Sequence, residues 1–274
     1  MTSRRIALYD GSLQMHCVTW GAPSAPPVVF LHGLRAYGQW FEEFAEAAAT
    51  DFYLIAPDQR GRGSTDWAND GRYDTDAYVA DLLQLANNWP LQRFAIIGHS
   101  MGGTNAINFA ACHPERVSAL VIVDSSPELN PVGLARIARE TSTMPQSFDS
   151  ETEARAYLRA LHAGASERSI STRLTYALAE RDGRITWRLD PAIFPLKPDP
   201  PERSWAALAA IGCPTLIIRA GNSDLVTIEC ANRMVQSLKH GEGAIVPNAG
   251  HMVLEDNPEG FTSVARPFLK KHLS

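Results

Sequence analysis

Residues 94–103 limit the fold of this chain more than any other segment. The apolar residues 94–97 are typical of a buried strand, and they end abruptly at Gly98-His99-Ser100-Met101-Gly102. Small residues suited to a helix follow. The two glycines let a strand and a helix approach closely, so the hydroxyl of Ser100 is expected at the end of the strand. The pattern predicts a nucleophilic serine whose target faces the first backbone N–H groups of a helix.

The length and composition of the chain are typical of a single large globular domain. It has 274 residues, of which 45% are hydrophobic and 20% charged, and its net charge is −5. Since it has no block of lysines and arginines, we expect a small-molecule substrate and no nucleic-acid partner. The N-terminal apolar stretch is too short for a secretory leader, and no segment reaches the length of a membrane span.

The cysteines and histidines of the chain give no sign of a disulfide framework or a metal site. The four cysteines are scattered without a C-x-x-C pair, which favours reduced thiols and a cytoplasmic location. No H-E-x-x-H motif occurs, and Gly61-Arg62-Gly63 does not continue into a dinucleotide-binding pattern. We therefore expect no metal and no cofactor. The sequence does not indicate the oligomeric state.

Short apolar runs alternate with helical patterns along most of the chain. The predicted buried strands are residues 28–31, 53–55, 95–97, 119–123, 215–218 and 243–246. Such continuous apolar runs suit parallel strands that are covered on both faces. Residues 6–9 and 13–20 are typical of a hairpin, with Asp10-Gly11 between them. The sequence thus predicts an α/β fold with a mostly parallel sheet.

The alternation stops between residues 128 and 208. No strong strand pattern occurs there, whereas several apolar residues have helical spacing. We interpret this stretch as a helical cap, or lid, inserted between two strands of a core formed by residues 1–127 and 209–274. Tyr176 and Trp187 in the cap are candidates for substrate binding.

A serine nucleophile needs a base, and the base needs a group that orients it. His251 is the best candidate for the base because it directly follows the last predicted strand, at the edge of the sheet where catalytic groups gather. Two aspartates could orient it. Asp124 and Asp224 both follow predicted strands, and both lie between the serine and the histidine in the sequence.

Three further motifs make the chain resemble the α/β-hydrolase superfamily over almost its whole length. They are Phe30-Leu31-His32-Gly33-Leu34, the D-x-R-G-x-G-x-S segment at residues 58–64, and Ala249-Gly250-His251-Met252. The resemblance implies a mostly parallel eight-stranded sheet flanked by helices, with the cap inserted after strand 6. In this superfamily the tight turn that carries the nucleophile between strand and helix is called the nucleophile elbow. A serine in the elbow, at position 100, argues against the dehalogenase and epoxide-hydrolase branches of the superfamily, which need a carboxylate nucleophile there.

The resemblance also implies roles for several residues. The oxyanion hole would consist of the backbone N–H groups of Leu34 and Met101. The usual acid of the family follows a glycine after the seventh strand, which matches Asp224, and we favour this residue. Asp124 is the alternative, because members that cleave small dicarboxylate amides have the acid after the sixth strand. Arg35, next to Leu34, is a candidate for binding a substrate carboxylate.

The predicted activity is that of a serine hydrolase that cleaves a small carboxylic ester through an acyl-enzyme. Ester cleavage is the first choice because it demands least of the site. The runner-up is an amide or carbon–carbon bond hydrolase acting on a small mono- or dicarboxylic acid. The same scaffold also supports cofactor-free lyases, oxygenases and perhydrolases, and it supports ligand receptors with slow turnover.

Overall fold

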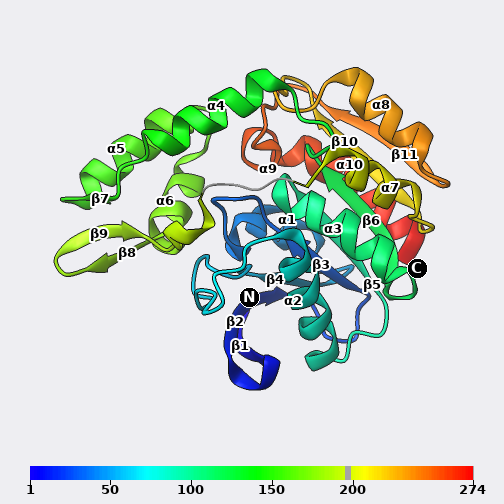
Figure 1. Ribbon diagram of the computed structural model, residues 1–274, viewed down its shortest axis with the longest axis horizontal. Helices are drawn as coiled ribbons and strands as arrows, with labels where there is room; N and C mark the ends of the chain where they lie inside the picture. The colour runs from blue at the N-terminus through cyan, green and yellow to red at the C-terminus, as the bar shows by residue number, and fades with distance from the viewer. Residues whose placement is uncertain (195–198, 274) are drawn as a thin grey trace.

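The computed structural model describes residues 1–194 and 199–273, and its centre is an eight-stranded sheet (Figure 1). The strand order is β1-β2-β4-β3-β5-β6-β10-β11. Strands β1 and β2 form the predicted antiparallel hairpin, β2 is antiparallel to β4, and the other neighbours are parallel. The predicted mostly parallel eight-stranded sheet is therefore confirmed. The strands are β1 Thr2–Leu8, β2 Leu13–Trp20, β3 Pro27–Leu31, β4 Tyr53–Pro57, β5 Phe94–His99, β6 Val117–Val123, β10 Thr215–Ala220 and β11 Gly241–Val246.

Helices cover both faces of the sheet, because alternate residues of its central strands point to opposite sides. Val29 and Ile96 belong to one apolar cluster, together with side chains from α2, α3, α7 and α8. Val28 and Ile97 belong to a second cluster, which α1 and α10 complete. Burying a large apolar side chain of this kind contributes about 1.5–3 kcal/mol. The helices are α1 Glu42–Ala48, α2 Thr75–Asn88, α3 Met101–Cys112, α7 Pro201–Ala209, α8 Ile228–Ser237, α9 Val253–Asp256 and α10 Pro258–Leu273.

The chain leaves the sheet after β6 and forms a separate unit before it returns through α7 to β10 (Figure 1). We call residues 128–194 the insertion; residues 195–198, within the predicted cap, lie outside the described residues. The insertion has its own small apolar cluster around Phe148 and Leu158. Helix α7, by contrast, packs with the core, and its Leu208 lies in the same cluster as Ile107 of α3. The elements of the insertion are α4 Pro131–Ser142, β7 Ser147–Phe148, α5 Glu151–Leu161, α6 Glu167–Tyr176, β8 Leu178–Arg181 and β9 Arg184–Trp187.

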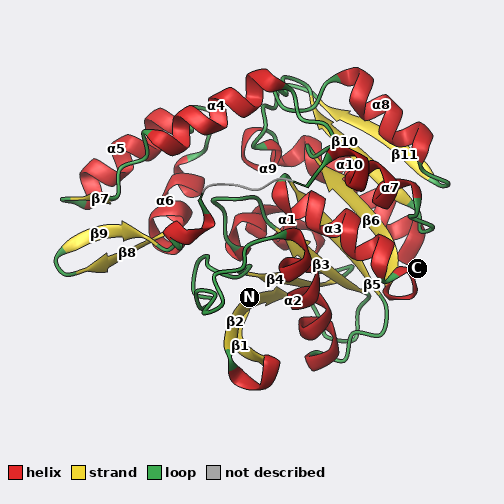
Figure 2. Ribbon diagram, viewed as in Figure 1, coloured by secondary structure: helices red, strands yellow, loops and turns green. Residues whose placement is uncertain are grey.

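The insertion contains a small antiparallel sheet in addition to the expected helices. Its strand order is β7-β9-β8, and Figure 2 shows it apart from the central sheet. Asp182 and Gly183 connect β8 to β9 with φ angles of 52° and 74°. Two positive φ angles in succession give the tight turn that Asp-Gly favours. That dipeptide is the local sequence signal for this hairpin, whose strands are too short to form long apolar runs.

Within the described residues, every helix is too short or too polar to cross a membrane.

Candidate active site

Ser100 lies in a sharp turn between β5 and α3. Its φ is 53° and its ψ is −123°, which is unusual backbone geometry for a residue with a side chain. The neighbouring glycines make the turn possible. A Cβ atom at Gly98 would lie 2.4 Å from the carbonyl oxygen of Gly102, and one at Gly102 would lie 2.0 Å from that of Leu31. Only glycine fits either position, so the serine is held at the edge of the sheet.

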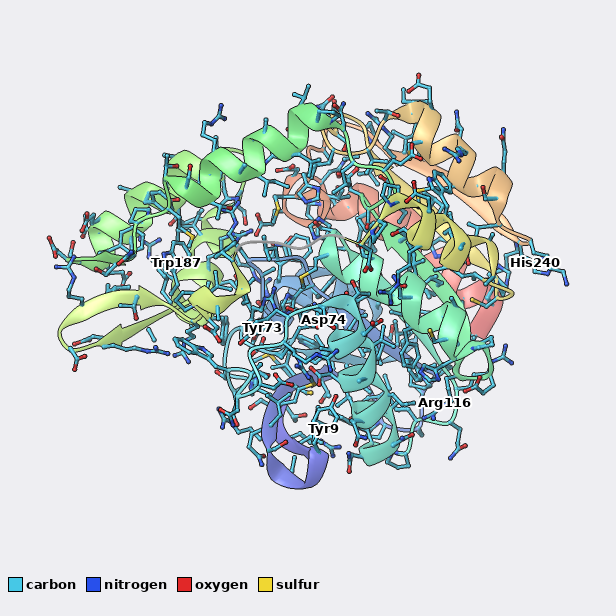
Figure 3. All side chains as sticks on the ribbon, in the orientation of Figure 1. Tyr9, Tyr73, Asp74, Arg116, Trp187 and His240 are labelled. Carbon is cyan, nitrogen blue, oxygen red and sulfur yellow. The ribbon has the colours of Figure 1, made fainter. Side chains whose placement is uncertain are left out.

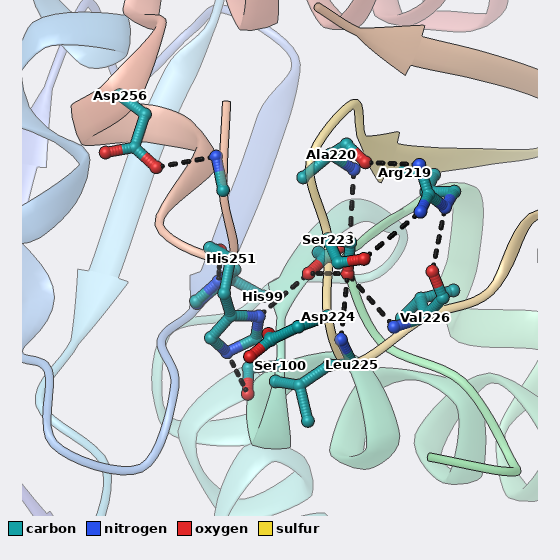
Figure 4. A network of polar contacts seen from close by, with 12 residues as sticks. His99, Ser100, Arg219, Ala220, Ser223, Asp224, Leu225, Val226, His251 and Asp256 are labelled. Carbon is teal, nitrogen blue, oxygen red and sulfur yellow. Dashed lines mark hydrogen bonds and ion pairs between the residues drawn. The ribbon is translucent and has the colours of Figure 1, made fainter. Parts of the chain in front are cut away.

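The side chains of Ser100, His251 and Asp124 form a continuous chain of hydrogen bonds. The Oγ of Ser100 lies 3.0 Å from Nε2 of His251, as Figure 4 shows. The Nδ1 of His251 lies 2.8 Å from Oδ2 of Asp124, whose side chain is fully buried. A carboxylate acceptor at Nδ1 places the imidazole proton there and leaves Nε2 free to accept the serine proton.

The prediction that Asp224 contacts His251 is wrong. The loop after β10 does lie beside the histidine loop, since the N–H of Asn222 donates to the carbonyl of Ala249 at 2.8 Å. However, Asp224 turns to Arg136 of α4, which binds it with Nε at 2.6 Å and Nη2 at 2.9 Å. The hydrogen bond from Arg136 lowers the pKa of the Asp224 carboxyl below its ordinary value.

Asp124 takes the place beside the histidine because it directly follows β6, the neighbour of β5 in the sheet. Its Oδ1 accepts the N–H of Ala220 at 3.0 Å, and its Oδ2 accepts the hydroxyl of Ser223 at 2.9 Å. The residue of the β10 loop that binds Asp124 is therefore Ser223 (Figure 4), whereas the carboxylate of Asp224 is bound by Arg136. Three donors hold one buried carboxylate, which fixes its orientation toward His251.

The side chain of His99 holds the loop that carries His251 in place. The Nε2–H of His99 donates to the carbonyl of His251 at 2.8 Å. Burial lowers the pKa of the His99 imidazole well below its ordinary value, with a smaller effect from the neighbouring His251. The carboxylate of Asp256 also accepts the N–H of Gly250 at 2.8 Å. These contacts fix the backbone on both sides of the histidine ring.

Of the two residues expected to form an oxyanion hole, Met101 directly follows Ser100 and Leu34 lies in the loop after β3. A Cβ atom at Gly33 would lie 3.3 Å from the Cβ of Ser100, so the loop after β3 passes close to the serine. Arg62 connects the two residues. Its Nε donates to the carbonyl of Leu34 at 3.0 Å, and its Nη2 lies 3.2 Å from the sulfur of Met101. Arg62 is not among the site residues predicted from the sequence.

The three predicted substrate-binding residues have different surroundings. Arg35 lies 2.5 Å from Glu140 of α4 and lines a pocket between the core and the insertion. Trp187 lines the same pocket, but it also packs in the insertion (Figure 3), where its Nε1 donates to the carbonyl of Pro145 at 2.7 Å. The ring of Tyr176 lies 6.0 Å from that of buried Tyr37. Tyr176 thus packs against the core and does not line this pocket.

Fold and site together define a hydrolase scaffold, and comparison with known proteins identifies the family. Residues 26–258 match the model of the alpha/beta hydrolase fold family, so the chain belongs to that family. It is 30% identical over 250 residues to the 3-hydroxybutyrate-oligomer hydrolase of Cupriavidus necator. These residues cover 85% of this chain and 85% of that protein.

Two further comparisons concern one kind of hydrolase. The 2-(acetamidomethylene)succinate hydrolase of Mesorhizobium japonicum is 26% identical over 86% of this chain and 85% of its own. A crystal structure of E-2-(acetamidomethylene)succinate hydrolase superposes with a TM-score of 0.89 and 24% identity, over 98% of this chain and 99% of that one. The structural likeness shows a shared fold.

Proposed function

We propose that this protein is a serine hydrolase that cleaves a carboxylic ester of a small molecule through an acyl-enzyme. The observation that carries the proposal is the hydrogen-bonded chain from Ser100 Oγ through His251 to Asp124. A serine hydroxyl becomes a nucleophile when a neutral imidazole accepts its proton, and the imidazole works best when a carboxylate orients it.

In the first half of the reaction, Nε2 of His251 takes the proton of Ser100 while Oγ attacks the substrate carbonyl. The oxygen of the tetrahedral intermediate accepts hydrogen bonds from the backbone N–H groups of Leu34 and Met101. Asp124 stabilises the imidazolium that forms. His251 then protonates the departing alcohol oxygen, the C–O bond breaks, and the acyl group remains on Ser100.

In the second half, water repeats the attack. His251 accepts a proton from the water, whose oxygen adds to the acyl carbonyl. The same two N–H groups stabilise the second intermediate, and the proton returns from His251 to Ser100 as the carboxylic acid leaves.

The second candidate is hydrolysis of an amide of a small carboxylic acid. It is favoured by the position of Asp124 after β6, the arrangement expected for members of the family that cleave dicarboxylate amides. The relative named 2-(acetamidomethylene)succinate hydrolase fits this candidate, whereas the relative named 3-hydroxybutyrate-oligomer hydrolase fits the ester hydrolase.

The test is labelling with a serine-directed phosphonate, combined with turnover of a panel of small esters and amides. We expect the phosphonate to label Ser100, and we expect Ser100→Ala to lower turnover by about 10⁵–10⁶-fold while the fold persists. Labelling at another serine would contradict the mechanism. A burst of product with negligible steady-state turnover on every compound would indicate a receptor instead of an enzyme.

A further inference from the structure

The pocket between the core and the insertion is lined by three arginines. Arg35 follows Leu34 in the loop after β3, Arg62 lies in the loop after β4, and Arg188 follows β9 of the insertion. Tyr37 and Trp187 contribute aromatic walls. In the part of the chain that the structure describes, no aspartate or glutamate lines this pocket. The lining therefore carries three positive charges, of which that of Arg35 is paired with Glu140 of α4.

Arg62 brings its charge into the protein interior, since only 1% of the residue is exposed. Besides the carbonyl of Leu34 and the sulfur of Met101, its guanidinium contacts the carbonyl of Arg60 at 2.8 Å. Its partners are neutral, and within residues 1–194 and 199–273 it forms no ion pair with a carboxylate. A buried guanidinium without a counter-charge is costly, and a bound anion would offset that cost.

Arg35 and Arg188 both have N–H groups left for a ligand. Arg35 uses Nη2 for Glu140, while its buried Nη1 has no hydrogen-bond partner among the described residues. Arg188 donates from Nε to the carbonyl of Leu178 at 2.8 Å and has only a long contact of 3.4 Å to Ser64. The Glu140 side chain shows that a carboxylate can approach Arg35 from the insertion.

We propose that this pocket binds a carboxylate carried by the acyl part of the substrate, so that the preferred esters are half-esters of small dicarboxylic acids. The proposal rests on the proposed function, because it assumes that the acyl carbonyl lies at Ser100. Arg62 contacts both oxyanion residues, and Arg35 directly follows one of them. A carboxylate a few bonds from the carbonyl can thus reach the arginines. The planar guanidinium matches a carboxylate with paired hydrogen bonds.

The experiment compares kcat/KM for matched para-nitrophenyl esters, butyrate against the succinate half-ester and valerate against the glutarate half-ester. Each pair differs in a terminal methyl group replaced by a carboxylate. We expect the half-esters to be preferred by about 10–100-fold, the range of one or two charge-assisted hydrogen bonds. Arg35→Gln should remove most of this preference, measured as the ratio of kcat/KM within each matched pair.

Two further variants test whether the preference for half-esters depends on the charge at Arg35. Glu140→Gln removes the carboxylate that occupies Arg35, so the preference for half-esters should increase. Arg139→Gln, on the exposed side of the same helix, removes a positive charge of the insertion outside the pocket and should leave the preference unchanged. Preference of the wild type for neutral esters, or an equal loss in Arg139→Gln and Arg35→Gln, would overturn the proposal.

Direct binding separates this proposal from the proposed function. Glutarate should bind the wild type in calorimetry and bind Arg35→Gln at least about tenfold more weakly, a loss of about 1.4 kcal/mol. If no ester is hydrolysed but glutarate binds in this way, the proposed function is wrong and the anion site stands. If neutral esters are hydrolysed through Ser100 and glutarate does not bind, the anion site is wrong and the hydrolase stands.

Discussion

Arg173 of α6 and Glu255 of α9 form an ion pair, with Nη2 and Oε1 separated by 2.7 Å and both side chains at most 5% exposed. The pair joins the insertion to the segment that follows His251. Glu255 also accepts the indole N–H of Trp40 at 2.7 Å and the hydroxyl of Ser169 at 2.8 Å. The insertion is therefore fastened to the core directly beside the histidine loop.

Breaking this pair is expected to be strongly destabilising. Glu255→Gln leaves Arg173 buried without a counter-charge, which should lower the free energy of unfolding by about 3–5 kcal/mol in a urea titration. Glu242→Gln is the control, because Glu242 pairs with Lys271 on the exposed surface. The control should cost at most about 1 kcal/mol. Equal effects of the two substitutions would contradict the expectation.

The two aspartates should differ sharply in their effect on turnover. Asp124→Asn removes the carboxylate that orients His251, so it should lower kcat by about 10⁴-fold, as loss of a triad acid does. Asp224→Asn weakens only the contact with Arg136 and should retain most of the activity. Both variants are compared at equal concentrations of folded protein, measured by circular dichroism and active-site titration. A severe defect in Asp224→Asn alone would reverse the assignment.

Two buried histidines, His32 and His99, and the partly buried His162 make the folded state sensitive to acid. Burial lowers the pKa of His32 to about 4 and that of His162 to about 3, and it holds the pKa of His99 well below its ordinary value. In the unfolded chain these groups take up protons near pH 6.5, so below about pH 6.5 the unfolded state binds more protons than the folded state. The free energy of unfolding should therefore fall as the pH is lowered from about 6.5 toward 4.

Urea titrations between these pH values test this expectation. His162→Asn removes one of the three groups, so the free energy of unfolding should depend less steeply on pH. His240→Asn is the control, because His240 is exposed, and it should leave the pH dependence unchanged. A pH dependence identical in His162→Asn and the wild type would show that His162 takes up its proton equally in both states.

The turn at Ser100 should not tolerate a methyl group. Gly102→Ala would place a Cβ atom 2.0 Å from the carbonyl oxygen of Leu31, so the turn must open and both stability and labelling of Ser100 should be lost. At Gly212 a Cβ atom would meet no atom within 4 Å. Gly212→Ala should leave the melting temperature unchanged or raise it. The free energy of unfolding should rise by at most about 1 kcal/mol. Normal labelling of Gly102→Ala would contradict this account of the elbow.

The strands and the positions of Ser100 and His251 could be predicted because their signals are local. A buried parallel strand is a continuous apolar run, and the glycines around Ser100 report a close backbone approach within a few residues. The choice between Asp124 and Asp224 depends on side-chain direction across two loops. It is decided by Arg136, which binds Asp224 from the insertion, and by Ser223, which binds Asp124 from the loop after β10. No pattern of neighbouring residues in the sequence encodes these two contacts.

The arginine pocket could not be predicted for a related reason. Arg35, Arg62 and Arg188 are widely separated in the chain, and each is an ordinary polar residue in its local context. The hairpin in the insertion is different, since Asp182-Gly183 is a local signal for a tight turn and could have been used. The contrast lies between backbone conformation, which adjacent residues determine, and charge placement, which the tertiary fold determines.

Strands β6 and β10 pair directly, from Leu120 beside Thr215 to Val123 beside Ile218. This pairing means that the insertion could be replaced by a different one. The chain leaves the core after β6 and re-enters it at α7, whose Leu208 packs with the core before the chain reaches β10, whatever length of chain joins these two points. A lid from another family member could be transplanted between these points without disturbing the sheet. Asp124 lies immediately before the point of departure, so a chimera should keep it and Ser223 together. Substrate range could then be varied independently of the bond-breaking machinery.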